Sequence, residues 1–101
     1  MSEATGIANE GNRVGVKLMG GEEAEAVATV IAAAYPEAEI DHYPSYISIE
    51  VPNRLVLDLA QISEQLGRPY DAPALLVILS SYNGRISLED ERITLTTEMG
   101  S

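Results

Sequence analysis

Apolar and polar positions along this chain follow two periods, and the period changes near glycine or proline. In residues 13–19, RVGVKLM, apolar side chains occupy alternate positions, which predicts a strand with one buried face. From about Glu22 to Tyr35 the apolar spacing becomes i, i+3, i+4, i+7, which predicts a helix with one buried stripe. Pro36 ends this helix, because proline cannot continue the backbone hydrogen bonds.

The next segments return to the period of a strand. Residues 38–43 and 46–51 are two predicted strands joined at Pro44-Ser45, and the second alternates strictly between apolar and polar side chains. Residues 54–57 are a further short strand. The middle of the chain is therefore predicted to be mainly sheet.

A short helix with start and stop signals follows. Asp58 is a predicted N-cap, and Gln61 stands three residues later, in the capping-box position. Gly67 fits the left-handed position after the last helical turn, and Pro69 prevents continuation. The predicted helix therefore lies between Asp58 and Gly67.

Residues 74–79, ALLVIL, are an apolar run without alternation. This pattern is rich in β-formers and predicts a strand covered on both faces, at the centre of a sheet. Asp71-Ala72-Pro73 precedes the run as a capping or turn signal, and Asn83-Gly84 follows it as a strong hairpin signal. Two more strands are predicted at residues 85–88 and 92–97, on either side of a charged turn.

The order of these elements predicts an α+β domain made of two β-α-β-β-type repeats, with mostly antiparallel sheet and two helices. Residues 1–12 are polar and lack periodicity, which predicts a flexible N-terminal tail. The folded part is predicted to be a single domain over residues 13–99, because a chain of 101 residues can bury one modest core.

The charge of the chain narrows the choice of partner. Sixteen acidic and six basic residues give a formal net charge of −10, which argues against nucleic acid and against an anionic membrane surface. A basic or mixed-charge protein is the natural counterpart, and the alternative is that the acidity only favours solubility. The chain has no cysteine, and no signal peptide or transmembrane run is recognisable, which predicts a cytoplasmic protein.

The sequence shows no recognisable motif for catalysis, metal binding or cofactor binding. His42 is the only histidine, and its neighbour Asp41 points to the other face of the predicted strand, so the two side chains do not converge. The acidic cluster of Glu22, Glu23 and Glu25 lacks the E-x-x-H spacing of dinuclear carboxylate sites. We therefore predict no catalytic, metal-binding or cofactor-binding residue, and a binding or regulatory module is favoured over an enzyme.

Residues 62–86, ISEQLGRPYDAPALLVILSSYNGRI, combine a short helix ending in Leu-Gly-Arg, an aromatic residue, an acidic turn and a strand ending in Ser-Tyr-x-Gly-x-Ile. With VGVKLM at residues 14–19 and LEDERITLTTEM at residues 88–99, this order resembles the coupling (effector) proteins of soluble diiron multicomponent monooxygenases. These accompany methane, phenol, toluene and alkene hydroxylases. The final acidic turn and strand are most similar to the toluene and alkene branch.

The resemblance implies a monooxygenase regulatory protein-like fold and a protein that carries no cofactor and catalyses nothing alone. Such proteins dock on the diiron hydroxylase component. There they tune oxygen activation, substrate access and the coupling of electron transfer to hydroxylation or epoxidation. We expect this chain to bind that hydroxylase and to be a monomer when free.

The residues expected to contact the hydroxylase are chosen by exposure and position. The first group lies where the predicted central strand leaves the core, and consists of Ser80, Ser81, Tyr82, Asn83 and Arg85. Tyrosine and arginine are frequent interface hot spots. The alternatives are that Tyr82 packs against the edge of the core and that Asn83 only enables the turn.

The second group surrounds the turn at Pro44, and consists of His42, Tyr43, Ser45 and Tyr46. The alternative here is that the two tyrosine rings pair with each other across the strands. Arg68 and Tyr70 are a third candidate pair, for which a cation at a helix C-terminus beside a packed aromatic is the favoured interpretation.

Two other functions stay open on the sequence alone. One is a small ferredoxin-like regulatory domain that dimerises through an edge strand and binds a metabolite. The other is a cofactor-free enzyme that uses His42 with Tyr43 or Tyr46.

Overall fold

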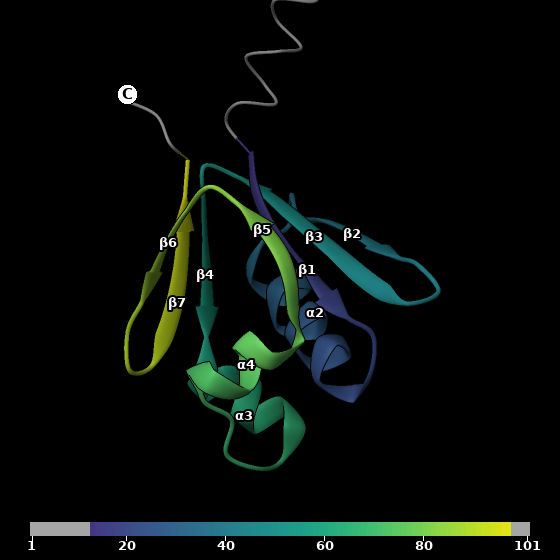
Figure 1. The fold of residues 1–101 in the computed structure, drawn as a ribbon, viewed down its shortest axis with the longest axis vertical. Coiled ribbons are helices and arrows are strands. Elements are labelled where there is room, and N and C mark those ends of the chain that lie inside the picture. Colours follow the sequence, from purple (N-terminus) through teal and green to yellow (C-terminus); the bar gives the residue numbers. More distant parts are fainter. Residues whose placement is uncertain (1–12, 98–101) are drawn as a thin grey trace, which may run out of the picture.

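Seven strands and three helices make up the part of the chain that the computed structural model describes, residues 13–97 (Figure 1). The predicted tail, residues 1–12, lies outside the described residues, as do residues 98–99 at the end of the predicted domain. In chain order the elements are β1 (Arg13–Met19), α2 (Glu22–Ala34), β2 (Glu39–His42), β3 (Tyr46–Pro52), β4 (Arg54–Asp58), α3 (Leu59–Leu66), α4 (Ala72–Ile78), β5 (Leu79–Asn83), β6 (Arg85–Leu88) and β7 (Arg92–Thr96).

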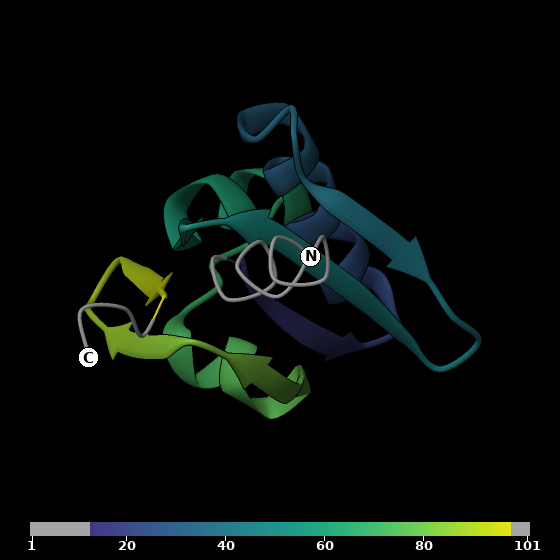
Figure 2. The same ribbon diagram turned by 90° about the horizontal axis from the view of Figure 1, so that it is seen from above.

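The strands form two sheets. Sheet A has the strand order β2-β3-β1-β5 and sheet B the order β4-β7-β6, and each pairing is antiparallel. In Figure 1 the helices α3 and α4 lie at the lower end, and in Figure 2 β2 and β3 lie on one side of the molecule with β6 and β7 on the other. The predicted α+β class with antiparallel sheet is confirmed. The predicted number of two helices is wrong, because α4 is a third.

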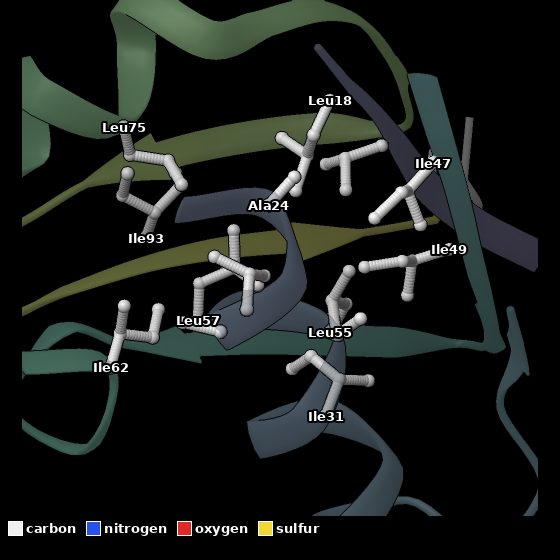
Figure 3. Packing of buried hydrophobic residues seen from close by; sticks show 14 of the residues in the cluster. Leu18, Ala24, Ile31, Ile47, Ile49, Leu55, Leu57, Ile62, Leu75 and Ile93 are labelled. Carbon is white, nitrogen blue, oxygen red and sulfur yellow. The ribbon is translucent and has the colours of Figure 1, made fainter. Parts of the chain in front are cut away.

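One hydrophobic cluster fills the space between the sheets and the helices. The predicted stripe of α2 is buried, and its Ala24, Val27 and Ile31 are fully enclosed. Alternate side chains of β1 and β3 face the same cluster, which explains the strand period in their sequences. Figure 3 shows side chains from both sheets and from all three helices gathered in this core; those labelled are Leu18, Ala24, Ile31, Ile47, Ile49, Leu55, Leu57, Ile62, Leu75 and Ile93.

Local signals determine both ends of α3, as predicted. The carboxylate of Asp58 accepts hydrogen bonds from the backbone N–H groups of Ala60 at 3.0 Å and Gln61 at 3.2 Å. Gly67 ends the helix in the left-handed conformation, with φ of 78°. The Asp58 carboxylate satisfies N–H groups that have no partner within the helix. The left-handed Gly67 turns the chain away from the helix axis.

We expect Asp58→Ala to lower the free energy of unfolding by about 1 kcal/mol, because two N–H groups of α3 lose their acceptor. Urea unfolding followed by circular dichroism would measure the change. Asp41→Ala is the matched control, since the Asp41 side chain is exposed and forms no hydrogen bond with a described residue. Equal losses in the two variants would contradict the capping role.

Residues 74–79 do not form the predicted central strand, because most of them belong to α4. The side chain of Asp71 accepts a hydrogen bond from the Ala74 N–H at 3.1 Å, and Pro73 occupies the first helical turn, where its missing N–H costs nothing. Leu75 is fully buried, whereas Val77 is 75% exposed. The apolar run therefore covers the end of the core on one side only, and the strand that follows, β5, is an edge strand of sheet A.

Asn83-Gly84 does not form the predicted hairpin turn. The two strands that it joins belong to different sheets, β5 to sheet A and β6 to sheet B. Gly84 has φ of 105°, and a Cβ at this position would lie 2.7 Å from the backbone oxygen of Thr96. Glycine is therefore required where the chain crosses from one sheet to the other.

Candidate functional site

The face of sheet A that does not point into the core is open, and we call it the outer face of sheet A. Residues paired directly across antiparallel strands share a face. The pairing places Ser48, Lys17 and Ser81 in one row of this face and Glu50, Gly15 and Asn83 in the next. Tyr46 and Met19 form a third row. Each of the three rows contains a residue of β3 and a residue of β1. The first two rows also contain a residue of β5.

A shallow hollow of about 150 Å³ lies at the centre of the outer face of sheet A. Gly15 allows β1 and β3 to approach closely beside it, because a Cβ there would overlap the backbone oxygen of Ile49 and lie 2.8 Å from Cγ of Glu50. The residues that line the hollow are Gly15, Val16, Lys17, Ser48, Glu50, Ser81, Tyr82 and Asn83. Most of them carry hydrogen-bonding side chains, so the hollow suits a polar contact.

Arg13 ties the four strands of sheet A together beside this hollow. Its Nε lies 3.3 Å from the carboxylate of Glu50 on β3, and its Nη2 lies 3.2 Å from that of Glu39 on β2. Nη2 is buried and makes this contact as an ion pair, without the alignment of a hydrogen bond. The Asn83 side chain on β5 donates a hydrogen bond to the Arg13 carbonyl at 3.0 Å. Asn83 therefore does more than enable a turn.

The structure divides the first predicted group between two sheets. Ser81 and Asn83 lie on the outer face of sheet A. Tyr82 pairs with the buried residue Val16 and therefore points to the opposite face of the sheet, but it is still 46% exposed. Ser80 is the extra residue of a bulge, because the pairing with β1 shifts between Lys17 and Leu18. Arg85 begins β6 in sheet B and is exposed.

The second predicted group lies at the β2–β3 hairpin. Tyr46 is on the outer face of sheet A, and its ring stacks on that of Tyr43 with centroids 4.7 Å apart, as the alternative interpretation expected. The Ser45 carbonyl accepts a hydrogen bond from the Gly20 N–H at 3.1 Å. His42 pairs with buried Ile47, so it faces the side of α2 rather than the outer face.

His42 does not join the other predicted residues. Its Nε2 lies 3.3 Å from the carboxylate of Glu25 on α2, and both side chains are more than half exposed. Neither tyrosine of the hairpin contacts this pair through a hydrogen bond between described residues. Within residues 13–97, no group of three His, Asp or Glu side chains could hold a metal ion.

Arg68 and Tyr70 connect the start of α2 to the segment between α3 and α4. The hydroxyl of Tyr70 donates a hydrogen bond to the carboxylate of Glu23 at 3.1 Å, and the Arg68 guanidinium lies 3.4 Å from the same residue. Burial of Tyr70 raises its pKa well above the usual range, and the negative charge of Glu23 raises it further. The packed aromatic and the cation therefore have a structural role, as favoured from the sequence.

Sequence reasoning missed the residues that connect the two groups, chiefly Gly15 and Lys17. The alternation in β1 places both on the side opposite its buried residues, so their outward direction was visible in the sequence. What the sequence did not show is that β1 lies between β3 and β5.

Over the described residues, none of the helices combines the length and the apolar character needed to cross a membrane.

Comparison with known proteins identifies the family of this chain. The sequence profile of the MmoB/DmpM family matches residues 12–96. The stimulatory component DmpM of phenol 2-monooxygenase from Pseudomonas sp. (strain CF600) is 31% identical over 74 residues, which are 73% of this chain and 82% of that protein. The effector component of propane 2-monooxygenase from Gordonia sp. (strain TY-5) is 34% identical over 83 residues, 81% of this chain and 74% of that protein. The predicted family is thus confirmed, while the similarity to the toluene and alkene branch stays a prediction.

Solved structures show the same fold. A chain in the structure of a phenol hydroxylase–regulatory protein complex superposes with a TM-score of 0.75 at 26% identity, over 83% of this chain and 97% of that one. The regulatory protein B of soluble methane monooxygenase has a TM-score of 0.67 at 25% identity, over 86% of this chain and 66% of its own. The named relatives are stimulatory, effector and regulatory components rather than catalytic subunits. The chain therefore belongs to the MmoB/DmpM family.

Proposed function

We propose that this protein is a cofactor-free regulatory component that docks on the diiron hydroxylase of a multicomponent monooxygenase. The observation that carries the proposal is the family match over residues 12–96, together with relatives that are a stimulatory component of phenol 2-monooxygenase and an effector component of propane 2-monooxygenase. The fold match to a chain of a phenol hydroxylase–regulatory protein complex supports a hydroxylase as the partner. The proposal includes a cytoplasmic location, since a chain without cysteine needs no oxidising compartment.

A protein without catalytic groups changes turnover by binding one conformation of its partner more tightly than another. A differential of about 1–3 kcal/mol, typical of coupled sites, shifts the equilibrium between two hydroxylase states about 5–150-fold. Such a shift accounts for the tuning of oxygen activation, substrate access and the coupling of electron transfer to hydroxylation or epoxidation. The proposal also includes that this protein is a monomer when free.

The docking surface in this proposal is the outer face of sheet A with its two borders. Ser81 and Asn83 beside the hollow offer hydrogen-bonding groups, and the stacked rings of Tyr43 and Tyr46 offer apolar area. Ser80, Tyr82 and Arg85 extend the surface along β5 and into β6. Ser45 lies in the hairpin turn at the other border, and His42 lies beside this turn on the side of α2. Lys17, Ser81 and Asn83 on this face are exposed among the described residues, so a partner can reach them without any rearrangement of the core.

We expect Ser81→Arg to raise the concentration of this protein that half-saturates its effect on hydroxylase turnover by about tenfold or more, equal to about 1.4 kcal/mol. The long charged side chain would fill the hollow and block a close approach. The measurement is a titration into the cognate hydroxylase and reductase, with turnover and product distribution as readouts.

Thr29→Arg is the matched control, because it adds the same side chain at an exposed position of α2. If Thr29→Arg weakened the effect and Ser81→Arg did not, the docking face would be the wrong one. If the unmodified protein changed neither turnover nor product distribution, the regulatory role itself would be refuted. Thermal stabilisation by a metabolite, without any effect on the hydroxylase, would support the ligand-binding alternative instead.

A further inference from the structure

The basic residues of this acidic chain differ in how they are paired. The chain has six Lys and Arg residues, sixteen Asp and Glu residues and a formal net charge of −10. Arg13, Arg68 and Arg92 each form ion pairs with glutamates. Lys17, Arg54 and Arg85 form no ion pair with a described residue, although carboxylates are abundant in the chain; of these three, Lys17 alone lies in sheet A, whereas the two arginines both lie in sheet B.

Arg54 and Arg85 lie in one row of sheet B. Arg54 of β4 and Arg85 of β6 both pair directly with Thr96 of β7, so the three residues share one face. The adjacent row, Leu55, Leu95 and Ile86, points into the core. The two arginines therefore stand on the solvent-facing side, about 10 Å apart, because neighbouring strands are spaced about 4.8 Å.

Two left-handed turns fix the backbone of this row. Asn53, directly before Arg54, has φ of 68°, and its carbonyl accepts a hydrogen bond from the Thr97 N–H at 3.1 Å. Gly84, directly before Arg85, has φ of 105° and is closely packed on the carbonyl of Thr96. Both turns are thus anchored on the end of β7. Figure 1 shows the β3–β4 turn, the β5–β6 crossing and the end of β7 together at the upper end of the molecule.

At about 10 Å and in solvent, the two like charges repel each other only weakly, by well under about 1 kcal/mol, so the row can form without a counter-charge and both arginines stay available to bind one. We propose that the row Arg54–Thr96–Arg85 binds carboxylate side chains of an acidic segment of the hydroxylase, an inference that rests on the proposed function. Arginine guanidinium groups bind carboxylates with paired hydrogen bonds, and the Thr96 hydroxyl between them adds a donor. The site would be a second contact beside the outer face of sheet A.

The surroundings favour a protein carboxylate over other anions. Nucleic acid or an anionic membrane would bring many negative charges against a chain of net charge −10, whereas a protein can present one acidic segment to two arginines. The row also continues the proposed docking surface, since a single residue, Gly84, separates Arg85 from Asn83 on sheet A. One partner can therefore contact both.

The test is the double variant Arg54→Gln/Arg85→Gln, titrated into the cognate hydroxylase and reductase at low and high salt. We expect the half-saturating concentration to rise at least about tenfold at low salt, and its dependence on salt to become weaker than that of the unmodified protein. Maximal turnover at saturation stays unchanged. Arg92→Gln is the control, because Arg92 occupies the same face of β7 and is paired with Glu89 at 2.8 Å, and it is expected to leave the titration unchanged.

Each other outcome has a defined meaning. A double variant that titrates like the unmodified protein overturns this inference and leaves the proposed function intact, whereas an unmodified protein without any effect on turnover overturns both. A lower urea midpoint in the double variant would show that the arginines are paired within the chain, and would also overturn it. Binding to vesicles of phosphatidylserine and phosphatidylcholine that is lost in the double variant would overturn the assignment to a protein carboxylate.

Discussion

Gly84→Ala is expected to lower the free energy of unfolding by about 2–5 kcal/mol, a large part of the stability of a small domain. Two effects add. An alanine at φ of 105° is strained, and its Cβ would lie 2.7 Å from the Thr96 carbonyl oxygen and 2.9 Å from a methyl group of Val14. This strain could be relieved only if the backbone moved where the chain crosses from β5 to β6. Urea unfolding of the purified variant measures the loss.

Two other glycines separate the two effects. Gly67→Ala places alanine at φ of 78° with open space around it, so we expect about 1–2 kcal/mol from backbone strain alone. Gly20→Ala has ordinary van der Waals distances, the nearest atom being the Ser45 carbonyl oxygen at 3.6 Å, so its stability should change by less than about 1 kcal/mol. A Gly84→Ala variant as stable as Gly67→Ala would show that the close packing on Thr96 is absent in solution.

Leu75→Ala is expected to lower the free energy of unfolding by about 2–4 kcal/mol, because it empties the one position of α4 that is fully buried. Leu75 lies in the same core as Ile93 of β7 and Ile62 of α3 (Figure 3). The cavity would therefore open where the helices close the end of the two sheets. Thermal and urea unfolding would both report the loss.

Val77→Lys is the discriminating partner of this experiment. In the helix α4, Val77 is 75% exposed near the C-terminal end, so a lysine there is expected to change stability by less than about 0.5 kcal/mol. In a central strand covered on both faces the same lysine would be buried without a partner, and the domain would unfold. If the Val77→Lys variant were unfolded, the result would favour the central strand that the sequence pattern predicts over the helix α4.

The features that the sequence predicted well depend on neighbours along the chain. The helix period of α2, the Asp58 cap and the Gly67 stop are each complete within a few residues, and the structure contains all three. The alternation of β3 likewise needs only one buried face. Such signals act before any tertiary contact forms, which is why they can be identified without one.

The features that the sequence did not predict depend on distant pairings. The β-forming run at residues 74–79 is helical because Asp71 and Pro73 start a helix and because the end of the core needs cover on one side only. Asn83-Gly84 is the usual sequence of a tight hairpin, yet here it crosses between sheets, because β5 pairs with β1. In both cases tertiary structure overrides the local preference.

The candidate site shows the same division. Exposure and residue type were enough to select Ser81, Asn83 and Tyr46, and the structure places them on one face. Lys17 and Gly15 were missed because they become neighbours of these residues only when β1 inserts between β3 and β5. Arg54 was missed for the same reason, since its proximity to Arg85 depends on β7.

The bulge at Ser80 has a consequence for the behaviour of the protein at high concentration. A regular edge strand with free backbone groups is a template for pairing with a second copy, and from there for aggregation. In β5 the extra residue breaks the even spacing of those groups, and the adjoining side chains are polar. A partner whose surface is shaped to the bulge can still bind there, whereas identical β5 edges fit each other poorly. Irregularity in this strand thus keeps a binding edge accessible and still opposes self-association.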